Sequence, residues 1–406
     1  MSATELARGL ADAAAFATGR PRWTTGATAL RQLRLTDFRN YRYLRLELDG
    51  CSVVLSGANG AGKTNLLEAV SFLVPGRGLR RARLDEVCRG GEGTDRAQGW
   101  AVAATLEGRQ GHIVLGTGLV APPAGGDGTT ARRSVRIDGR TATSQLELAE
   151  HVGAVWLTPQ NDRLFTDGPG NRRRFLDRMV AAFAPGHAGE LAAYEHAMRQ
   201  RARLLEEGRR EPAWLAALED SMARHGVAVA ATRADLVARL DAAAREAAGP
   251  FPRASLALAG ELDAWIATDA AADVEDRLRA RLAALRNVDG QAGTATCGPH
   301  RSDLLVQHLD RSIPAAQGST GEQKAMLVAI VLAHARLVAA AHGRAPLLLL
   351  DEIGAHLDAE KRQALFDELE AIGAQAWMTG TDEALFQPLA GRAQFLRVAA
   401  GAVAGA

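Results

Sequence analysis

The stretch Gly57-Ala58-Asn59-Gly60-Ala61-Gly62-Lys63-Thr64 decides the fold of this chain. The apolar run Ser52 to Ser56 before it predicts a buried strand, and the spacing of apolar residues from Asn65 to Leu73 predicts a helix after it. A strand, a glycine-rich loop and a helix in this order form a phosphate cradle, because the glycines let successive backbone N–H groups point inward. All eight residues are therefore candidate nucleotide-binding residues. We expect Lys63 to reach the β- and γ-phosphates, and the Thr64 hydroxyl to bind Mg²⁺. A chance match among 42 glycines is the alternative, and both flanks disfavour it.

Length and composition narrow the class of protein. At 406 residues two or three domains are expected, and a net charge of +1 predicts no strong general attraction to nucleic acid, so any such site must be a local patch. The three cysteines form no C-x-x-C pair, which excludes a disulfide framework or zinc site as an expectation. The most apolar helix candidate, Met326 to Ala341, is predicted to be too short to span a bilayer. Residues 1–28 are expected to be a disordered extension, and the chain is expected to be cytoplasmic, with no membrane partner.

The lysines are unusually few. Only three of the 48 basic residues are lysines, namely Lys63, Lys324 and Lys361. In a chain so biased towards arginine, a lysine can mark a place where a guanidinium does not substitute. The loop explains Lys63, Lys324 lies beside a second motif, and Lys361 is interpreted as ordinary helix surface.

The segment before the loop predicts two strands between Leu30 and Leu48, joined through Asp37 to Tyr41. Arg39 and Asn40 lie close enough to the loop in sequence to touch the nucleotide, and a simple polar turn is an equal alternative. Alternating apolar residues from Trp100 to Leu119 and from Ser134 to Ile137 predict a small antiparallel β lobe.

The basic cluster Gly76 to Arg83 is either a nucleic-acid contact or a solvated loop. From Pro169 to about Leu285 the chain is rich in Ala, Leu, Arg and Glu at helical spacing, which predicts a helical arm. Arg172, Arg173 and Arg174 open this arm; pairing with acidic neighbours is favoured over pairing with phosphates.

The αβ pattern returns after Gly290. Ser319-Thr320-Gly321-Glu322-Gln323-Lys324 opens a long apolar helix, and a helix that begins with Ser and Gly offers an anion-binding end. Leu347 to Leu350 predicts a buried strand that ends in Asp351 and Glu352. Acids at the carboxyl end of a central parallel strand lie where α/β sheets bind ligands. We expect Asp351 to bind Mg²⁺ and Glu352 to act as the base that positions water.

Together these motifs resemble those of the ATP-binding-cassette (ABC) ATPases. More narrowly, the chain resembles the RecF family of bacterial recombination mediators of DNA gap repair. The motifs that carry this second resemblance are Phe38-Arg39-Asn40-Tyr41, Gly168-Pro169 with Arg172-Arg173-Arg174-Phe175-Leu176-Asp177, Gly298-Pro299-His300-Arg301 and Ser319-Thr320-Gly321-Glu322-Gln323-Lys324.

The resemblance implies ATP and Mg²⁺ as cofactors and an ATP-dependent homodimer with two sandwiched nucleotides. Ser319, Gly321 and Glu322 of one subunit would then face the γ-phosphate held by Lys63 of the other. The dimer would clamp single-stranded or gapped DNA until hydrolysis releases it. The family's partners would be RecR and RecO, which help to place RecA on single-stranded DNA, in support of replication restart and SOS induction.

Two further site residues follow from the resemblance only. Gln160, in the turn after the strand Val152 to Leu157, would be the glutamine that joins Mg²⁺ and the attacking water. Thr381 would occupy the switch position that is often His in transporter relatives, and slow turnover is therefore expected. The alternatives are an ABC-type ATPase subunit of a transporter, which leaves the helical arm unexplained, and a non-catalytic ATP-gated scaffold.

The expected fold class is α/β: a P-loop ABC-type ATPase domain with a small antiparallel β lobe and an inserted α-helical arm domain. The expected division places the N-terminal part of the ATPase domain with its β lobe at 29–168. The helical arm follows at 169–287, and the C-terminal part of the ATPase domain at 288–406.

Overall fold

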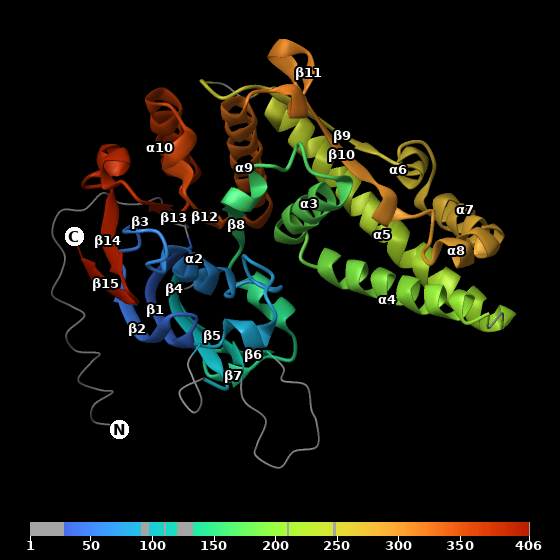
Figure 1. Cartoon of the computed structure of the whole chain (residues 1–406), viewed down its shortest axis with the longest axis horizontal. Helices are drawn as coiled ribbons and strands as arrows, with labels where there is room; N and C mark the ends of the chain where they lie inside the picture. Colours follow the sequence, from blue (N-terminus) through green and yellow to red (C-terminus); the bar gives the residue numbers. More distant parts are fainter. Residues whose placement is uncertain are drawn as a thin grey trace.

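The computed structural model describes residues 28–90, 97–108, 111–119, 133–208, 211–246 and 249–405. The extension expected at residues 1–28 therefore lies outside the described residues except for Thr28. Two six-stranded sheets, a three-stranded sheet and the helices around them make up this part of the chain (Figure 1).

The central sheet has the strand order β15-β14-β3-β13-β12-β8, and neighbouring strands run parallel except for β14 and β15. Its strands are β3 (Ser52–Ser56), β8 (Ala154–Leu157), β12 (Leu347–Leu350), β13 (Ala376–Gly380), β14 (Ala393–Ala399) and β15 (Ala402–Gly405). The strand expected at Ser52 to Ser56 and the one expected at Leu347 to Leu350 both form, and they flank β13 in the middle of the sheet.

Both faces of this sheet are buried, which is why its strands are continuous apolar runs. Leu347 and Leu349 pack into one hydrophobic core, together with α2 and the β lobe. Leu348 and Leu350, the alternate residues of the same strand, pack into the other core against the helices of the opposite face. Four consecutive leucines thus serve two cores, because successive side chains in a strand point to opposite faces.

The expected β lobe is the second six-stranded sheet, with the order β2-β1-β4-β5-β6-β7 and antiparallel pairing throughout. Its strands are β1 (Ala29–Phe38), β2 (Tyr41–Glu47), β4 (Trp100–Gly108), β5 (Gly111–Leu119), β6 (Arg133–Ile137) and β7 (Arg140–Thr141). The lobe lies against the face of the central sheet that carries α2 (Lys63–Ser71) (Figure 1).

The helical arm extends to one side of the molecule (Figure 1). Its helices are α3 (Pro169–Phe183), α4 (His187–Glu206), α5 (Pro212–Arg245), α6 (Glu261–Ile266), α7 (Ala271–Ala284) and α8 (Arg286–Ala292). The sequence predicted a purely helical arm, and this is wrong in one place, because the strand β9 (Ala254–Ala259) lies within the arm. This strand pairs with β10 (Asp303–His308), which itself pairs with β11 (Ile313–Pro314). The sequence periodicity missed β9, since its partner follows more than forty residues later.

The remaining helices are α9 (Thr320–His342) and α10 (Ala359–Ile372). The expectation that the apolar helix near Met326 is too short to cross a bilayer is wrong, since α9 has 23 residues and is long and apolar enough by composition. Within the described chain α9 is a core helix: 67% of its most apolar window is buried against its neighbours. It packs on α3, α5, α10 and β8.

Candidate nucleotide-binding site

The sequence motifs that predicted phosphate and metal binding meet at one edge of the central sheet. The strands β3, β12, β13 and β8 are parallel, so their carboxyl ends lie together. Ser56 leads into the glycine-rich loop, Leu350 leads into Asp351, and Gly380 leads into Thr381. Ligands bind at this edge in open α/β sheets.

Lys63 closes the glycine-rich loop from inside. Its ammonium nitrogen Nζ donates to the backbone oxygens of Gly57 at 2.7 Å and Ala58 at 2.9 Å, and the residue is 5% exposed. Burial lowers the pKa of Lys63, an effect opposed by the nearby carboxylates of Glu352 and Asp351. The ammonium group is therefore held at the centre of the loop by carbonyl oxygens, which an incoming phosphate can replace.

Gly62 is the glycine for which the structure gives the clearest reason. Its φ of +117° is a conformation that side chains rarely adopt, and a Cβ there would lie 2.5 Å from the Asn40 amide nitrogen Nδ2 and 2.7 Å from the Tyr41 hydroxyl. Asn40 Nδ2 also donates to the Ala61 backbone oxygen at 3.3 Å, and Tyr41 donates to Gly62 O at 3.1 Å. The turn between β1 and β2 thus supports the loop directly.

Thr64 and Asp351, the two predicted magnesium ligands, are brought together although 287 positions separate them. The Thr64 hydroxyl donates to both carboxylate oxygens of Asp351 at 3.0 Å. Asp351 is 5% exposed, and its backbone N–H donates to Leu157 O at 2.9 Å. A hydroxyl and a carboxylate at this spacing are the oxygen donors that Mg²⁺ prefers.

Thr379 is a site residue that the sequence did not indicate. Its hydroxyl donates to Asp351 Oδ1 at 2.7 Å and accepts from the Glu352 backbone N–H at 2.8 Å, and the residue is fully buried. It therefore orients Asp351 and Glu352 from the neighbouring strand β13. Glu352 adopts a left-handed backbone conformation with φ of +53°, directly after β12. A lone threonine in an apolar strand carries no sequence signal, and only the pairing of β12 with β13 finds it.

Arg39 contacts the helix behind the loop. Its guanidinium donates to both carboxylate oxygens of Glu68, at 2.7 and 2.8 Å, and to the Glu86 backbone oxygen at 2.8 Å. Arg80 donates to the same Glu68 carboxylate at 2.9 Å, and this acid is fully buried on α2. Asn40 and Arg39 share an open cleft with Asn65 and Arg80. Glu68 is the second residue that sequence reasoning missed, although an acid between apolar neighbours on α2 was a usable signal.

Thr381 and Gln160 each follow a strand of this edge, Thr381 after β13 and Gln160 after β8. Thr381 is exposed in a cleft that residues 56–61 of the loop region also line, together with Glu383 and Arg397. Gln160 is exposed in the 3-10 turn Pro159–Asn161 after β8, and the structure gives it no hydrogen bond to the loop. The geometry therefore brings Thr381 to the phosphate loop and leaves Gln160 at the neighbouring strand end.

The Ser319 motif lies at the start of α9, and among the described residues its side chains make no hydrogen bond to the phosphate loop. Ser319 caps the helix, because its hydroxyl accepts from the Glu322 backbone N–H, and the Glu322 carboxylate accepts from Ser319 N at 2.8 Å. The pKa of Glu322 is lowered to about 2, chiefly by the hydrogen bonds that its carboxylate accepts from the backbone and side chain of Ser319. The Arg311 guanidinium, which donates to Glu322 Oε1 at 2.8 Å, adds to this effect. Gly321 is exposed in the first turn.

Comparisons with known proteins agree with this arrangement. The family model described as RecF/RecN/SMC N terminal domain matches residues 29–398. The DNA replication and repair protein RecF of Mesorhizobium japonicum is 52% identical over 379 residues, which cover 93% of this chain and 97% of that protein. That of Rhizobium etli strain CIAT 652 is 49% identical over 380 residues, which cover 93% and 99%.

The chain belongs to the RecF family.

Solved structures show the same fold. The recombination mediator protein RecF-ATPrS in the RecFOR pathway matches with a TM-score of 0.81 at 19% identity, over 95% of this chain and 100% of that one. The SmcHead bound to the C-winged helix domain of ScpA matches with a TM-score of 0.51 at 16% identity, over 92% and 96%. Residues 29–398 of this RecF-family chain thus share the fold of ABC-type ATPase heads, as expected from the motifs.

Two arm motifs of this RecF-family chain form structural contacts. Arg172 makes a two-pronged ion pair with Asp303 at 2.8 Å, and Arg173 donates to the Ser302 backbone oxygen at 2.6 Å, so both fasten α3 to β10. His300 Nδ1 lies 2.6 Å from the Tyr194 hydroxyl. The expectation that these arginines pair with acidic neighbours is confirmed for Arg172, whereas Arg173 donates to a backbone oxygen and Arg174 to the Asn171 side chain.

Lys324 has a structural partner as well. Its ammonium nitrogen lies 3.4 Å from the Asp162 carboxylate, and the lysine is 4% exposed. It connects the start of α9 to the turn that carries Gln160. Lys361, in contrast, pairs with Asp358 on the surface of α10.

Proposed function

We propose that this chain is an ATP-dependent DNA-binding protein of recombinational gap repair. In this proposal the ATP-bound homodimer clamps gapped or single-stranded DNA and, with RecO and RecR, promotes the loading of RecA. Membership in the RecF family supports it, as do relatives named DNA replication and repair protein RecF that match along almost their whole length. The arrangement of Lys63, Thr64 and Asp351 at one sheet edge is the structural observation that carries it.

The residues present fit a magnesium nucleotide. ATP with Mg²⁺ supplies the phosphoanhydride that is cleaved and the charge that offsets its oxygens. Lys63 is placed to donate to the phosphates from inside the loop, and Thr64 with Asp351 would hold the metal. Thr379 keeps the Asp351 carboxylate in its orientation. The backbone N–H groups of residues 57–62 complete an anion-binding concavity at the N-terminus of α2.

Glu352 is proposed as the general base that positions the attacking water, with Gln160 as the glutamine beside it. The backbone of Glu352 is fixed by its bond to Thr379. Arg39 and Asn40 are proposed to border the nucleotide through their shared cleft, and Thr381 to occupy the switch position beside the loop. A threonine there offers a hydroxyl but no titratable imidazole, consistent with slow turnover.

The Ser319 motif can contact a bound nucleotide only if that nucleotide lies on the phosphate loop of a second copy of the chain. The capped start of α9 presents backbone N–H groups and helix-dipole charge at the surface, which is the chemistry that binds a γ-phosphate. We propose that Ser319, Gly321 and Glu322 face the nucleotide held by the partner's loop. The capping bonds of Glu322 keep this helix end in shape.

The division into parts is also proposed. The N-terminal part of the ATPase domain with its β lobe would comprise 29–168, and the arm would begin at Pro169. Since α8 contacts α4, and β10 pairs with β9, the arm is better ended after β11, near residue 318, than at 287. The transporter interpretation leaves the helical arm unexplained. The non-catalytic scaffold remains the second candidate and is distinguished by ATP hydrolysis.

DNA binding with and without ATP tests the proposal. Fluorescence anisotropy of a gapped duplex, at fixed ionic strength, should show tight binding only with ATP and Mg²⁺. Lys63→Ala should abolish the ATP-dependent part, because the loop then lacks its central cation. Lys361→Ala is the matched control, since that lysine lies on the surface of α10. ATP-dependent DNA binding that persists in Lys63→Ala contradicts the switch.

Light scattering tests the dimer. The protein should be a monomer without nucleotide and a dimer with ATP, and Ser319→Asp should remain a monomer because a carboxylate repels the γ-phosphate. Asp still caps a helix, so the variant is expected to fold. Ala280→Asp, at an exposed site on α7, is the control for the added charge. A dimer formed by Ser319→Asp contradicts the proposed interface.

A further inference from the structure

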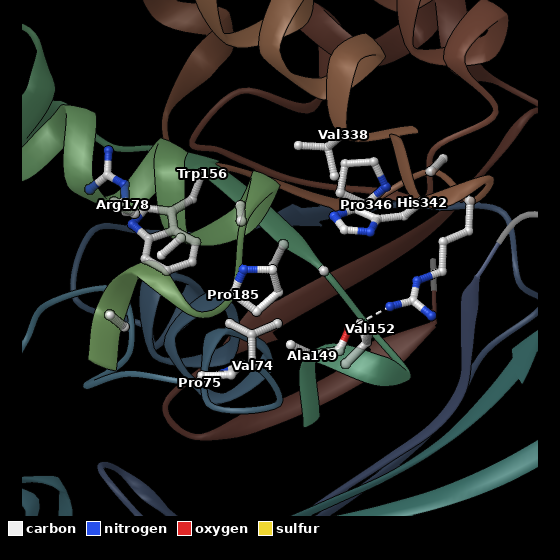
Figure 2. A pocket seen from close by; sticks show the side chains of 17 residues that line it. Val74, Pro75, Ala149, Val152, Trp156, Arg178, Pro185, Val338, His342 and Pro346 are labelled. Atoms are coloured by element: carbon white, nitrogen blue, oxygen red, sulfur yellow. Dashed lines mark hydrogen bonds between the residues drawn. The ribbon is translucent and has the colours of Figure 1, made fainter. Parts of the chain in front are cut away.

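A pocket lies at the opposite edge of the central sheet from the phosphate loop (Figure 2). It is bounded by Gly153 and Pro346, just before β8 and β12 begin, and by Val74, beyond the end of α2. The arm contributes α3, and the end of α9 closes the pocket with Val338. The space measures about 660 Å³, part of which opens to solvent. Four separate segments of the fold thus meet around one small, mostly apolar volume.

The charged side chains that line this pocket are both positive. They are Arg178 and Arg344, and none of the lining residues is Asp or Glu. Arg344 is occupied by the backbone oxygens of Ala149 and Glu150. Among the described residues Arg178 has no carboxylate partner, and its guanidinium lies over two aromatic rings. At the Arg178 end the pocket therefore carries a positive charge without a paired acid, against apolar walls.

Two hydrogen-bond donors at one end of the pocket have no partner in the described structure. They are the indole N–H of Trp156, a residue that is 8% exposed, and the buried Nη2 of Arg178. The guanidinium carbon of Arg178 lies 5.1 Å from the Trp156 ring centroid, so the two side chains are neighbours (Figure 2). Leaving a buried donor unpaired costs about 1–3 kcal/mol, and more when the group is charged.

Packing of Arg178 on its two aromatic neighbours is the simplest alternative. A cation over the rings of Trp156 and Phe175, whose centroid is 5.2 Å away, is stabilised by about 0.5–2 kcal/mol. That contact uses the flat face of the guanidinium and leaves its N–H groups, which lie in the plane, without acceptors. It also leaves the Trp156 N–H unpaired. The stacking explains where Arg178 lies but not why two buried donors beside a pocket have no acceptor.

We propose that this pocket binds a compact amphiphilic anion, an apolar ring or branched chain that carries one carboxylate or sulfonate. The anionic oxygens accept from Arg178 and Trp156 after a side-chain shift that opens these two solvent-shielded N–H groups to the pocket, and the apolar part packs against Val74, Pro185 and Val338. The absence of acids among the lining residues removes repulsion, and the apolar walls select against fully hydrated anions such as inorganic phosphate. This site is separate from the phosphate loop and does not depend on the proposed function.

Direct binding tests the site. Isothermal titration of the full-length protein uses 1-naphthaleneacetate as the probe and the neutral 2-(1-naphthyl)ethanol as its uncharged analogue. One equivalent of the anion should bind, and at least tenfold more tightly than the neutral analogue. Because the probe binds the folded state only, it should also raise the melting temperature.

Variants locate the binding. Arg178→Met keeps a long side chain without the charge and should weaken binding of the anion at least tenfold. Ala181→Phe fills the pocket and should abolish binding of both probes. Arg174→Met, on the same helix at an exposed position, is the control and should bind as the unaltered protein does. Melting curves and circular dichroism establish that each variant folds.

Three results overturn the proposal: no binding of the anion, equal affinity for the charged and neutral probes, or binding that survives in both Arg178→Met and Ala181→Phe. Should Ala181→Phe unfold, Trp156→Phe replaces it, since this change removes only the indole N–H and part of the ring. Trp156→Phe should weaken binding of the anion several-fold and leave binding of the neutral probe unchanged. An unaltered affinity for the anion in this variant contradicts the assignment of Trp156 as a donor.

Discussion

Replacing Thr379 with valine removes one hydroxyl from the centre of the candidate site at constant volume. The hydroxyl makes two bonds, one to the Asp351 carboxylate at 2.7 Å and one from the Glu352 backbone N–H at 2.8 Å. A hydrogen bond to a charged group contributes about 1.5–3 kcal/mol, and an amide N–H left unpaired costs about 1–3 kcal/mol. Because relaxation recovers part of this loss, we expect Thr379→Val to lower the free energy of unfolding by about 2–4 kcal/mol.

The same change should weaken binding of magnesium nucleotide. Without Thr379 the Thr64 hydroxyl is the side-chain donor that remains to the Asp351 carboxylate among the described residues, so the carboxylate is oriented less well. Supporting bonds of this kind typically change metal affinity by about 10- to 100-fold. Chemical denaturation measures the free energy of unfolding. Titration with a fluorescent ATP analogue at several Mg²⁺ concentrations measures the affinity for magnesium nucleotide.

Two further variants make this test specific. Thr379→Ser keeps the hydroxyl and loses a methyl group, so it should restore the Mg²⁺-dependent affinity at a stability cost of about 1 kcal/mol. Thr232→Val removes a hydroxyl that donates only to the Ala228 backbone oxygen on α5, and should leave nucleotide binding unchanged. If Thr379→Val matches the unaltered protein in both stability and Mg²⁺ dependence, the positioning role of Thr379 is refuted.

The remaining predictions concern the arm, the core and the chemistry. Arg201→Met should lower the free energy of unfolding by about 3–5 kcal/mol, measured by urea denaturation, because it leaves the buried carboxylates of Glu219 and Asp289 without their shared cation. His334, whose pKa burial lowers from 6.5 to about 4, should contribute up to about 3 kcal/mol of stability that is complete above pH 6.5 and is lost as pH falls to 4. The unfolded chain binds a proton there first, so His334→Gln should flatten the stability profile in that window. Glu352→Gln should lower the rate of ATP hydrolysis by about 100-fold or more without preventing nucleotide binding.

The Arg201 and Glu352 variants each have a control on the surface. Arg199→Met breaks an exposed pair with Glu195 and should change stability by less than about 1 kcal/mol. Glu360→Gln, in the first turn of α10, should leave hydrolysis unchanged. A stability profile of His334→Gln that still falls between pH 6.5 and 4 as in the unaltered protein refutes the assignment to that histidine. Hydrolysis by Glu352→Gln at the unaltered rate removes Glu352 as the base.

The sequence alone determined the ATPase core of this protein, because its signals are local. The loop from Gly57 to Thr64 and the leucine run before Asp351 each carry a strand, a turn and a reactive group within a dozen residues. Backbone sterics and burial of both sheet faces fix such segments with little help from the rest of the chain. The family resemblance rests on the same short motifs, and the matches over residues 29–398 confirm it.

Only the tertiary structure decided which side chains meet. Thr379 reaches Asp351 because β12 and β13 are neighbours, and Arg39 reaches Glu68, which Arg80 also binds, because the β lobe lies on α2. The pairing of β9 with β10 and the two unpaired donors of Trp156 and Arg178 arise in the same way. These contacts join residues far apart in sequence, where neither periodicity nor spacing carries information. Their energy comes from burial and hydrogen bonding that exist only once the two cores have formed.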